Sequence, residues 1–200
     1  RSTGLGLSGN AFDNWGGGGA SSASLTLVNG NNALGSLDTS ENAALEGSFD
    51  KLRYAMTRQQ AVTPAVSLYA TLSGQHATQQ LDSSEKFTLG GSNGVRAYPS
   101  SEGSGSRGQL FNLELRWRLP QGLGLTGFYD WGHVNNLDTS PSYSLQGAGL
   151  GLAWQPANSI NLKAVWAHRL GSNPNLTATG RDQDGSLDIN RWWLTASLAF

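Results

Sequence analysis

The chain has 200 residues, a formal net charge of −1 at pH 7 and no cysteine. The missing cysteine excludes disulfide bonds and cysteine metal sites, and the near-neutral charge gives no basic surface for a nucleic acid. No run of eighteen apolar residues occurs, which excludes a transmembrane helix but leaves open a membrane barrel built of strands. Because the chain starts at Arg1 without methionine or an apolar leader, we expect a fragment of a longer protein.

Nine segments place an apolar residue at every second position, a pattern that predicts strands with one apolar and one polar face. The segment 109–119 is the clearest, because Leu113 and Leu115 alternate there with Glu114 and Arg116. In chain order, the nine predicted strands are residues 2–10, 22–29, 48–58, 64–75, 109–119, 123–132, 144–154, 160–170 and 190–200.

The connections between these strands alternate strictly between short and long. The strand pattern alone fits either a soluble sandwich or a membrane barrel, but this alternation and the tryptophans near strand ends favour the barrel. The sequence therefore predicts an all-β fold, an antiparallel transmembrane β-barrel with periplasmic turns and extracellular loops. Nine is an odd number, so we expect an incomplete barrel whose other strands precede Arg1. The short connections are 12–21, 59–63, 120–122 and 155–158, and the long ones are 30–46, 76–108, 135–143 and 171–189.

The glycine-rich run 12–21 could suggest a phosphate cradle, but no Lys-Ser/Thr pair follows it, so we expect a turn. The acidic run 181–188 partly resembles a calcium loop, yet its ligand spacing is incomplete, so we expect a solvated extracellular loop. We expect neither a metal nor another cofactor.

The long connection 85–108 contains six glycines, and we expect it to be a shaped loop without strand or helix. Gly90, Gly91 and Gly94 supply backbone angles that other residues disfavour, so the segment can fold back on itself. A loop of this length without secondary structure is uncommon inside a compact domain and is usually either functional or disordered. The aromatic residues and Arg96 at its centre argue against disorder.

The sequence LGGSNGVRAYP within this loop resembles the loop of the two-partner secretion transporters, the haemolysin secretion/activation family of bacterial outer membranes. That family carries a VRG(F/Y) signature, and Val95, Arg96 and Tyr98 match it, following Gly90 and Gly91. Ala97 departs from the usual glycine. The second family motif, F-x-D-x-G, is matched on a predicted strand by Phe128, Asp130 and Gly132, which point into the lumen by alternation.

The resemblance covers nearly the whole chain and implies its architecture. Residues 1–200 would form the C-terminal part of a sixteen-stranded barrel, with the loop 77–107 inserted into the lumen. It also implies that Arg96 pairs with Asp130. An arginine inside a barrel needs a carboxylate, and breaking a dry pair costs about 3 to 5 kcal/mol. A purely structural alternative is that Arg96 only fixes a plug.

The function that the resemblance implies is conduction of an unfolded exoprotein, of haemolysin or adhesin type, to the cell surface. Glu114, Arg116 and Lys163 would line the path. The expected partners are the secreted exoprotein, the outer-membrane bilayer and the barrel assembly machinery, which would recognise the terminal Phe200. We expect no nucleic acid partner and a monomer.

Two other classes of function were compared with this one. An outer-membrane enzyme would need an assembled catalytic group, but alternation places His133 and His168 on the apolar face, and His76 has no apparent acidic partner. We therefore expect no catalytic residues. A general porin or an autotransporter-type passive pore would explain the strands, but not the arginine loop together with F-x-D-x-G.

Overall fold

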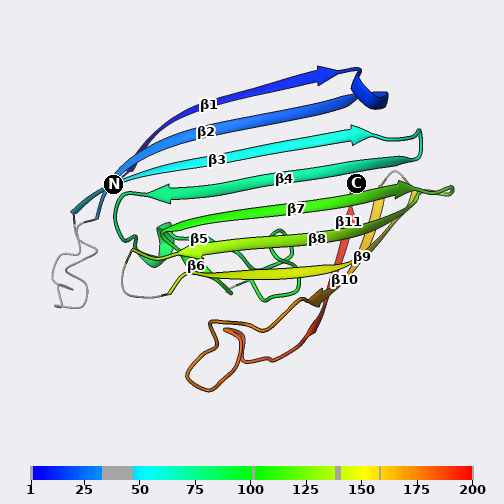
Figure 1. Cartoon of the computed structure of the whole chain (residues 1–200). Coiled ribbons are helices and arrows are strands. Elements are labelled where there is room, and N and C mark those ends of the chain that lie inside the picture. The colour runs from blue at the N-terminus through cyan, green and yellow to red at the C-terminus, as the bar shows by residue number, and fades with distance from the viewer. Residues whose placement is uncertain (1, 33–46, 101, 138–140, 158, 200) are drawn as a thin grey trace.

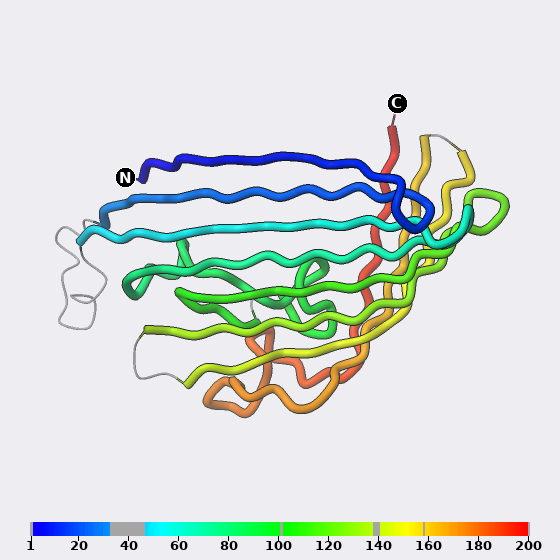
Figure 2. Tube along the Cα trace, turned by 45° about the horizontal axis from the view of Figure 1, so that its top comes forward, coloured from blue at the N-terminus to red at the C-terminus, as the bar shows by residue number. Residues whose placement is uncertain are grey.

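The computed structural model describes residues 2–32, 47–100, 102–137, 141–157 and 159–199. Nine strands form one antiparallel sheet in the order β1-β2-β3-β4-β7-β8-β9-β10-β11. The sheet curves along its width from β1 at one edge to β11 at the other (Figures 1 and 2). The strands are β1 (Ser2–Asp13), β2 (Gly19–Asn32), β3 (Gly47–Ala61), β4 (Val66–Ala77), β7 (Arg107–Arg118), β8 (Leu123–Asn135), β9 (Tyr143–Ala157), β10 (Ile160–Arg169) and β11 (Asn190–Leu198).

The nine predicted strands are confirmed, although most of them are longer than the alternation indicated. β1 and β2 stay paired from Ser2 and Gly30 to Asp13 and Gly19. Small and polar residues near the turn give no apolar alternation, yet their main-chain groups continue the ladder. The glycine-rich run between the two strands is a turn, as predicted, with a short 3₁₀ helix η1 (Trp15–Gly17) and positive φ at Gly17 and Gly18.

The expectation of a loop without strands between β4 and β7 is wrong in detail. Two short strands, β5 (Phe87–Thr88) and β6 (Ser104–Gly105), pair with each other, and a 3₁₀ helix η4 (Ser83–Glu85) precedes them. Ala77 and Arg107, the expected loop ends, belong to β4 and β7. Two-residue strands are too short to show a period of two, so the sequence pattern could not indicate them.

The two faces of the sheet differ as alternation predicted. The convex face carries leucines and tryptophans that remain exposed, including Leu5 at 76% and Leu194 at 79%. A continuous apolar surface of this kind is typical of contact with a membrane. Among the described residues, no helix is long and apolar enough to cross a membrane.

A compact core lies on the concave face, between the sheet and the connection 78–106. Leu89, Val95, Ala97 and Tyr98 of the connection are fully buried there. They pack on the inner side of β7 to β10, and each larger apolar side chain contributes about 1.5 to 3 kcal/mol by leaving water. Figure 1 shows the connection lying under the sheet. Phe200 and residues 33–46 of the first long connection lie outside the described residues.

Candidate functional site

The central part of the connection is held in a tight fold by its own main chain. Val95 donates its N–H to the carbonyl oxygen of Leu89 at 2.7 Å, and Gly94 donates to Gly91 at 3.0 Å. Gly91 has a φ of 111°, in the region that favours glycine. A Cβ at Gly94 would lie 1.9 Å from the carbonyl oxygen of Leu89, so a larger residue cannot take this position.

Ala97, which departs from the family signature, fits without a left-handed backbone. Among the described non-glycine residues, only Gln121 has a positive φ. The methyl group of Ala97 lies against Gly147 of β9, where a Cβ would come within 2.6 Å of it. The missing side chain at Gly147 therefore leaves the space that Ala97 fills.

Arg96 points from the loop into the wall of the sheet and contacts two carboxylates. Its Nε and Nη2 atoms donate to the two carboxylate oxygens of Asp130, at 2.9 and 2.7 Å. Its main-chain N–H donates to Asp130 as well, at 3.0 Å. The remaining nitrogen, Nη1, contacts Glu114 at 2.7 Å. Arg96 is 6% exposed and Asp130 is completely buried, so this pairing is formed largely away from water.

The charges of this cluster balance. Burial by itself would lower the pKa of the Arg96 guanidinium, but Asp130 and Glu114 outweigh burial and raise it above its ordinary value. Glu114 also pairs with Arg116 at 2.7 Å, so two arginines face two carboxylates. Arg116 in turn lies 3.7 Å above the ring of Tyr69. The guanidinium of Arg96 therefore stays charged and fixed in place.

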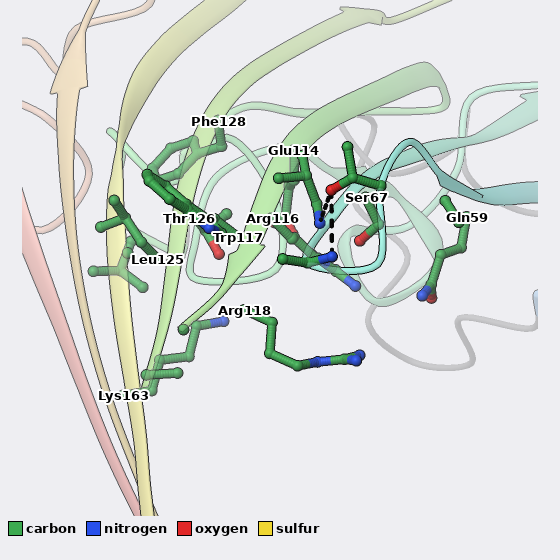
Figure 3. Close-up of a pocket in the computed structure, with 18 of the residues that line it drawn as sticks. Gln59, Ser67, Glu114, Arg116, Trp117, Arg118, Leu125, Thr126, Phe128 and Lys163 are labelled. Carbon is green, nitrogen blue, oxygen red and sulfur yellow. Dashed lines mark hydrogen bonds and ion pairs between the residues drawn. The ribbon is translucent and has the colours of Figure 1, made fainter. Parts of the chain in front are cut away.

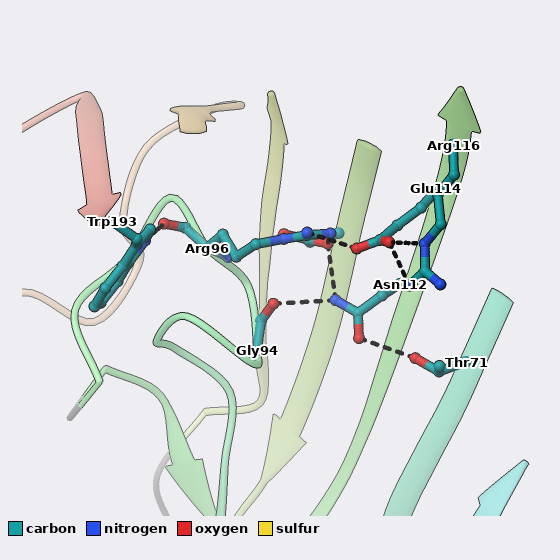
Figure 4. Close-up of polar contacts among 8 residues, drawn as sticks. Thr71, Gly94, Arg96, Asn112, Glu114, Arg116 and Trp193 are labelled. Atoms are coloured by element: carbon teal, nitrogen blue, oxygen red, sulfur yellow. Dashed lines mark hydrogen bonds and ion pairs between the residues drawn. The ribbon is translucent and has the colours of Figure 1, made fainter. Parts of the chain in front are cut away.

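Neutral side chains complete the cluster (Figure 4). Asn112 donates both to Asp130, at 2.8 Å, and to the carbonyl oxygen of Gly94, at 3.0 Å. Trp193 of β11 donates its indole N–H to the carbonyl oxygen of Arg96 at 2.8 Å. The Phe128 ring lies 3.5 Å from the Arg96 guanidinium, at a distance that permits a cation–π contact. The loop is thus tied to several strands at once.

The connection 170–189 also folds back onto the concave face. Asp182 is completely buried, accepts from Asn173 at 2.9 Å and forms an ion pair with Arg169 of β10. Glu102, in the first connection, accepts from the main-chain N–H of Gln183 at 2.9 Å. The expectation that 181–188 is simply a solvated loop is therefore wrong for Asp182, which β10 holds inward.

Arg169 also contacts Tyr98, and it therefore links the connection 170–189 to the connection 78–106. The guanidinium carbon of Arg169 lies 4.3 Å from the centre of the Tyr98 ring. Burial raises the pKa of the Tyr98 hydroxyl above its ordinary value, although the nearby Arg169 opposes this shift. Tyr98 therefore remains neutral and packs as an aromatic side chain between the loop and β10.

Beside the arginine cluster, a cavity of about 550 Å³ extends toward the short turns. Arg96, Glu114, Arg116 and Lys163 all line it, so the predicted lumen-facing residues gather around one space. Figure 3 shows Lys163 of β10 and Arg118 of β7 extending into it. Arg118 and Lys163 form no ion pair within the described part of the chain, so this end of the cavity is cationic.

The structure thus brings the predicted loop and wall residues together. Gly132 provides room, because a Cβ there would lie 2.7 Å from Leu89. His133 and His168 lie on the convex face, away from Asp130; His133 is stacked on Trp131, and His168 is tilted against Trp166. Three contributors were not singled out in the sequence: Asn112, Trp193 and the Arg169–Asp182 pair. Asn112, Trp193 and Arg169 stand at inward positions of predicted strands, but nothing in the sequence links Arg169 to Asp182.

Comparisons with known proteins agree with this fold. The family model "Haemolysin secretion/activation protein ShlB/FhaC/HecB" matches residues 1–154. The heme/hemopexin transporter protein HuxB of Haemophilus influenzae is 26% identical over 174 residues, which cover 81% of this chain and 29% of that protein. The outer membrane transporter CdiB of Dickeya dadantii is 31% identical over 145 residues, which cover 68% of this chain and 26% of that protein.

A solved structure extends the comparison to the fold. CdiB from Escherichia coli superposes with a TM-score of 0.79 and 21% identity, covering 100% of this chain and 36% of that one. The chain thus spans less than a third of the length of the curated relatives that it matches. With its apolar convex face and an outer membrane transporter among its relatives, it is an outer-membrane protein. The family match covers most of the chain, which therefore belongs to the haemolysin secretion/activation protein family ShlB/FhaC/HecB, the transporters of two-partner secretion.

Proposed function

We propose that this chain forms part of an outer-membrane pore that passes an unfolded exoprotein of haemolysin or adhesin type to the cell surface. The observation that carries the proposal is the Arg96–Asp130–Glu114 cluster, which fixes a structured loop against the concave wall. In this proposal Arg96 is a positioning residue, because each of its three guanidinium nitrogens donates a hydrogen bond to a protein carboxylate.

The cargo path runs along the cavity beside that loop. Its walls carry the charged side chains of Arg116, Arg118 and Lys163, so an extended chain finds hydrogen-bonding groups along the way. The loop packed on the concave face takes up part of the space there, and the cavity left beside it suits an extended chain. The exoprotein therefore threads as an extended segment and folds outside.

The proposed pore does no chemistry on its cargo. Its histidines lie apart from the Asp130 cluster, and the sequence has no nucleotide-binding motif. The relatives' names describe transporters, and HuxB is named for heme and hemopexin. The proposed partners of this chain are its own secreted exoprotein, the lipid bilayer and the barrel assembly machinery acting on Phe200, with the full protein working as a monomer.

A secretion assay tests this function. The full-length protein containing this chain is co-expressed with its exoprotein, as the parent and as Arg96→Ala. Insertion of the barrel is checked by heat-modifiable gel mobility. The control is Arg181→Ala, because the Arg181 side chain is exposed and, among the described residues, donates a hydrogen bond only to Gly185 of its own loop.

We expect Arg96→Ala to insert but to secrete at least about tenfold less, because a loss of about 1.4 kcal/mol already shifts a population tenfold. Arg181→Ala should secrete normally. Unchanged secretion by Arg96→Ala would contradict the role assigned to the loop. A full-length protein that conducts small solutes but secretes no exoprotein would instead indicate a general porin or an autotransporter-type pore.

A further inference from the structure

A group of polar side chains interrupts the apolar convex face at the end where the long connections begin. Two rows of side chains make it up, and we call it the rim patch. Gln109 pairs with His133, and Arg107 pairs with Asn135, across β7 and β8. His76 and Tyr54 extend the two rows over β4 and β3. Together these six residues line a pocket of about 220 Å³.

The rim patch lies directly above the apolar band. The next row toward the short turns consists of Met56, Leu72, Phe111 and Trp131, joined by the strand register. Because long connections are extracellular in barrels of this kind, the patch lies at the outer edge of the membrane. That is the level of the lipid headgroups, with the acyl chains below.

The electrostatics of the patch favour an anion. Arg107 donates its Nε to the carbonyl oxygen of Ala77 at 2.9 Å, which fixes the guanidinium. Its two terminal nitrogens form no ion pair within the described residues, and no carboxylate lines the pocket. Asp50 of β3 lies on the same face, but its carboxylate accepts a hydrogen bond from the Asn29 side chain, at 2.8 Å, and does not line the pocket. A planar guanidinium with free donors is well suited to phosphate oxygens.

Neighbouring groups are positioned to add donors. The His133 ring is stacked on Trp131, with centroids 6.3 Å apart, and its Nδ1 contacts Ser144 at 2.9 Å. With Nδ1 engaged by Ser144, Nε2 is the ring nitrogen that can donate to a ligand. Tyr54 reaches across Gly74, where a Cβ would lie 2.3 Å from the Tyr54 hydroxyl. Gly74 therefore lets that hydroxyl approach Gln109.

We propose that the rim patch binds the phosphate group of a phosphorylated outer-leaflet glycolipid. Arg107 grips two phosphate oxygens, His133 and Gln109 donate to the others, and the acyl chains lie on Phe111 and Trp131. The apolar row directly below the anion site selects a lipid-borne phosphate over a free one. The protein thereby acquires a bound lipid beside the strands that carry the arginine loop.

Native mass spectrometry of the full-length protein tests the proposal. The purified protein is incubated with a bisphosphorylated lipid A, and the retained lipid is counted for the parent, Arg107→Gln, Arg107→Lys and the double variant Arg107→Gln/His133→Gln. Arg53→Gln is the matched control, because Arg53 stands at a similar depth on the concave face and is exposed. Dephosphorylated lipid A and inorganic phosphate are the two ligand controls.

We expect Arg107→Gln to retain about fivefold less lipid than the parent, as for the loss of one arginine at an anionic surface. The double variant should retain less still, Arg107→Lys should recover part of the binding, and Arg53→Gln should match the parent. Equal retention of dephosphorylated lipid would overturn the proposal, as would equal retention by Arg107→Gln and Arg53→Gln. Binding of inorganic phosphate as tightly as lipid would overturn it too. Secretion is assayed separately, so this result does not depend on the proposed pore.

Discussion

The indole nitrogen of Trp193 lies 2.8 Å from the carbonyl oxygen of Arg96 and donates a hydrogen bond to it. β11 is an edge strand of the described sheet, so this bond ties the edge of the sheet to the arginine loop. The loop is therefore held both by the ion pairs of the Arg96 side chain and by the hydrogen bond to the Arg96 main chain.

Replacing Trp193 with phenylalanine should loosen the loop while keeping most of the packing. The lost hydrogen bond is worth about 0.5 to 1.5 kcal/mol. Hydrogen exchange at the Val95 amide, which is bonded inside the loop, should accelerate accordingly. Trp192→Phe is the control, because Trp192 is 65% exposed on the convex face. Equal exchange in the two variants would contradict this role of Trp193.

The two carboxylates around Arg96 should differ in their effects. Asp130→Asn leaves a buried arginine without its bidentate partner and should cost about 3 to 5 kcal/mol of unfolding free energy. Glu114→Gln leaves that partner in place and should cost about 1.5 kcal/mol. Urea unfolding of the full-length protein in micelles measures both values. A larger loss in Glu114→Gln would mean that Asp130 is not the main anchor.

The inward fold of the connection 170–189 should depend on Asp182. Asp182→Asn weakens the ion pair with Arg169 inside the protein, so the connection should detach and become accessible to limited proteolysis. Asp188→Asn removes the same charge from an exposed residue and should leave the cleavage rate unchanged. Similar cleavage of the two variants would show that the ion pair does not hold the connection.

Alkaline pH should weaken the packing of the loop through Tyr98. Burial raises the pKa of this hydroxyl, and the nearby Asp182 and Glu102 raise it further, while Arg169 opposes them. The unfolded chain releases the proton at about pH 10. The stabilisation is therefore fully present below that pH and is lost as the pH rises through the higher folded pKa. The unfolding midpoint should fall above about pH 10 more steeply in the parent than in Tyr98→Phe. Parallel curves would exclude Tyr98 as the cause.

The strands and their faces could be predicted because alternation is a local property. The sequence around Leu113 and Glu114 is enough to assign them to opposite faces of the strand. The inward direction of Asp130 followed from the same rule, and the family motifs indicated Arg96 as its partner. These two parts of the site needed no knowledge of tertiary structure beyond the barrel itself.

The remaining contacts depend on how irregular segments fold, which no period encodes. Asp182 stands in a polar run typical of a solvated loop, and only the return of its connection to β10 buries it against Arg169. The ion pair between Glu114 and Arg96 could not be predicted, because it depends on how deeply the loop enters the concave side of the sheet. The short strands β5 and β6 likewise arise from the folded loop and not from alternation.

The most direct test of the pore is to locate the passing exoprotein. A photo-crosslinking residue is placed at Lys163, which lines the cavity, or at Leu162, which faces the membrane on the same strand. Secretion is stalled with an exoprotein that carries a stably folded C-terminal domain. We predict crosslinks to the exoprotein from position 163 and none from position 162. Crosslinks from both positions alike, or from neither while secretion continues in the unstalled strain, would contradict a path along the concave face.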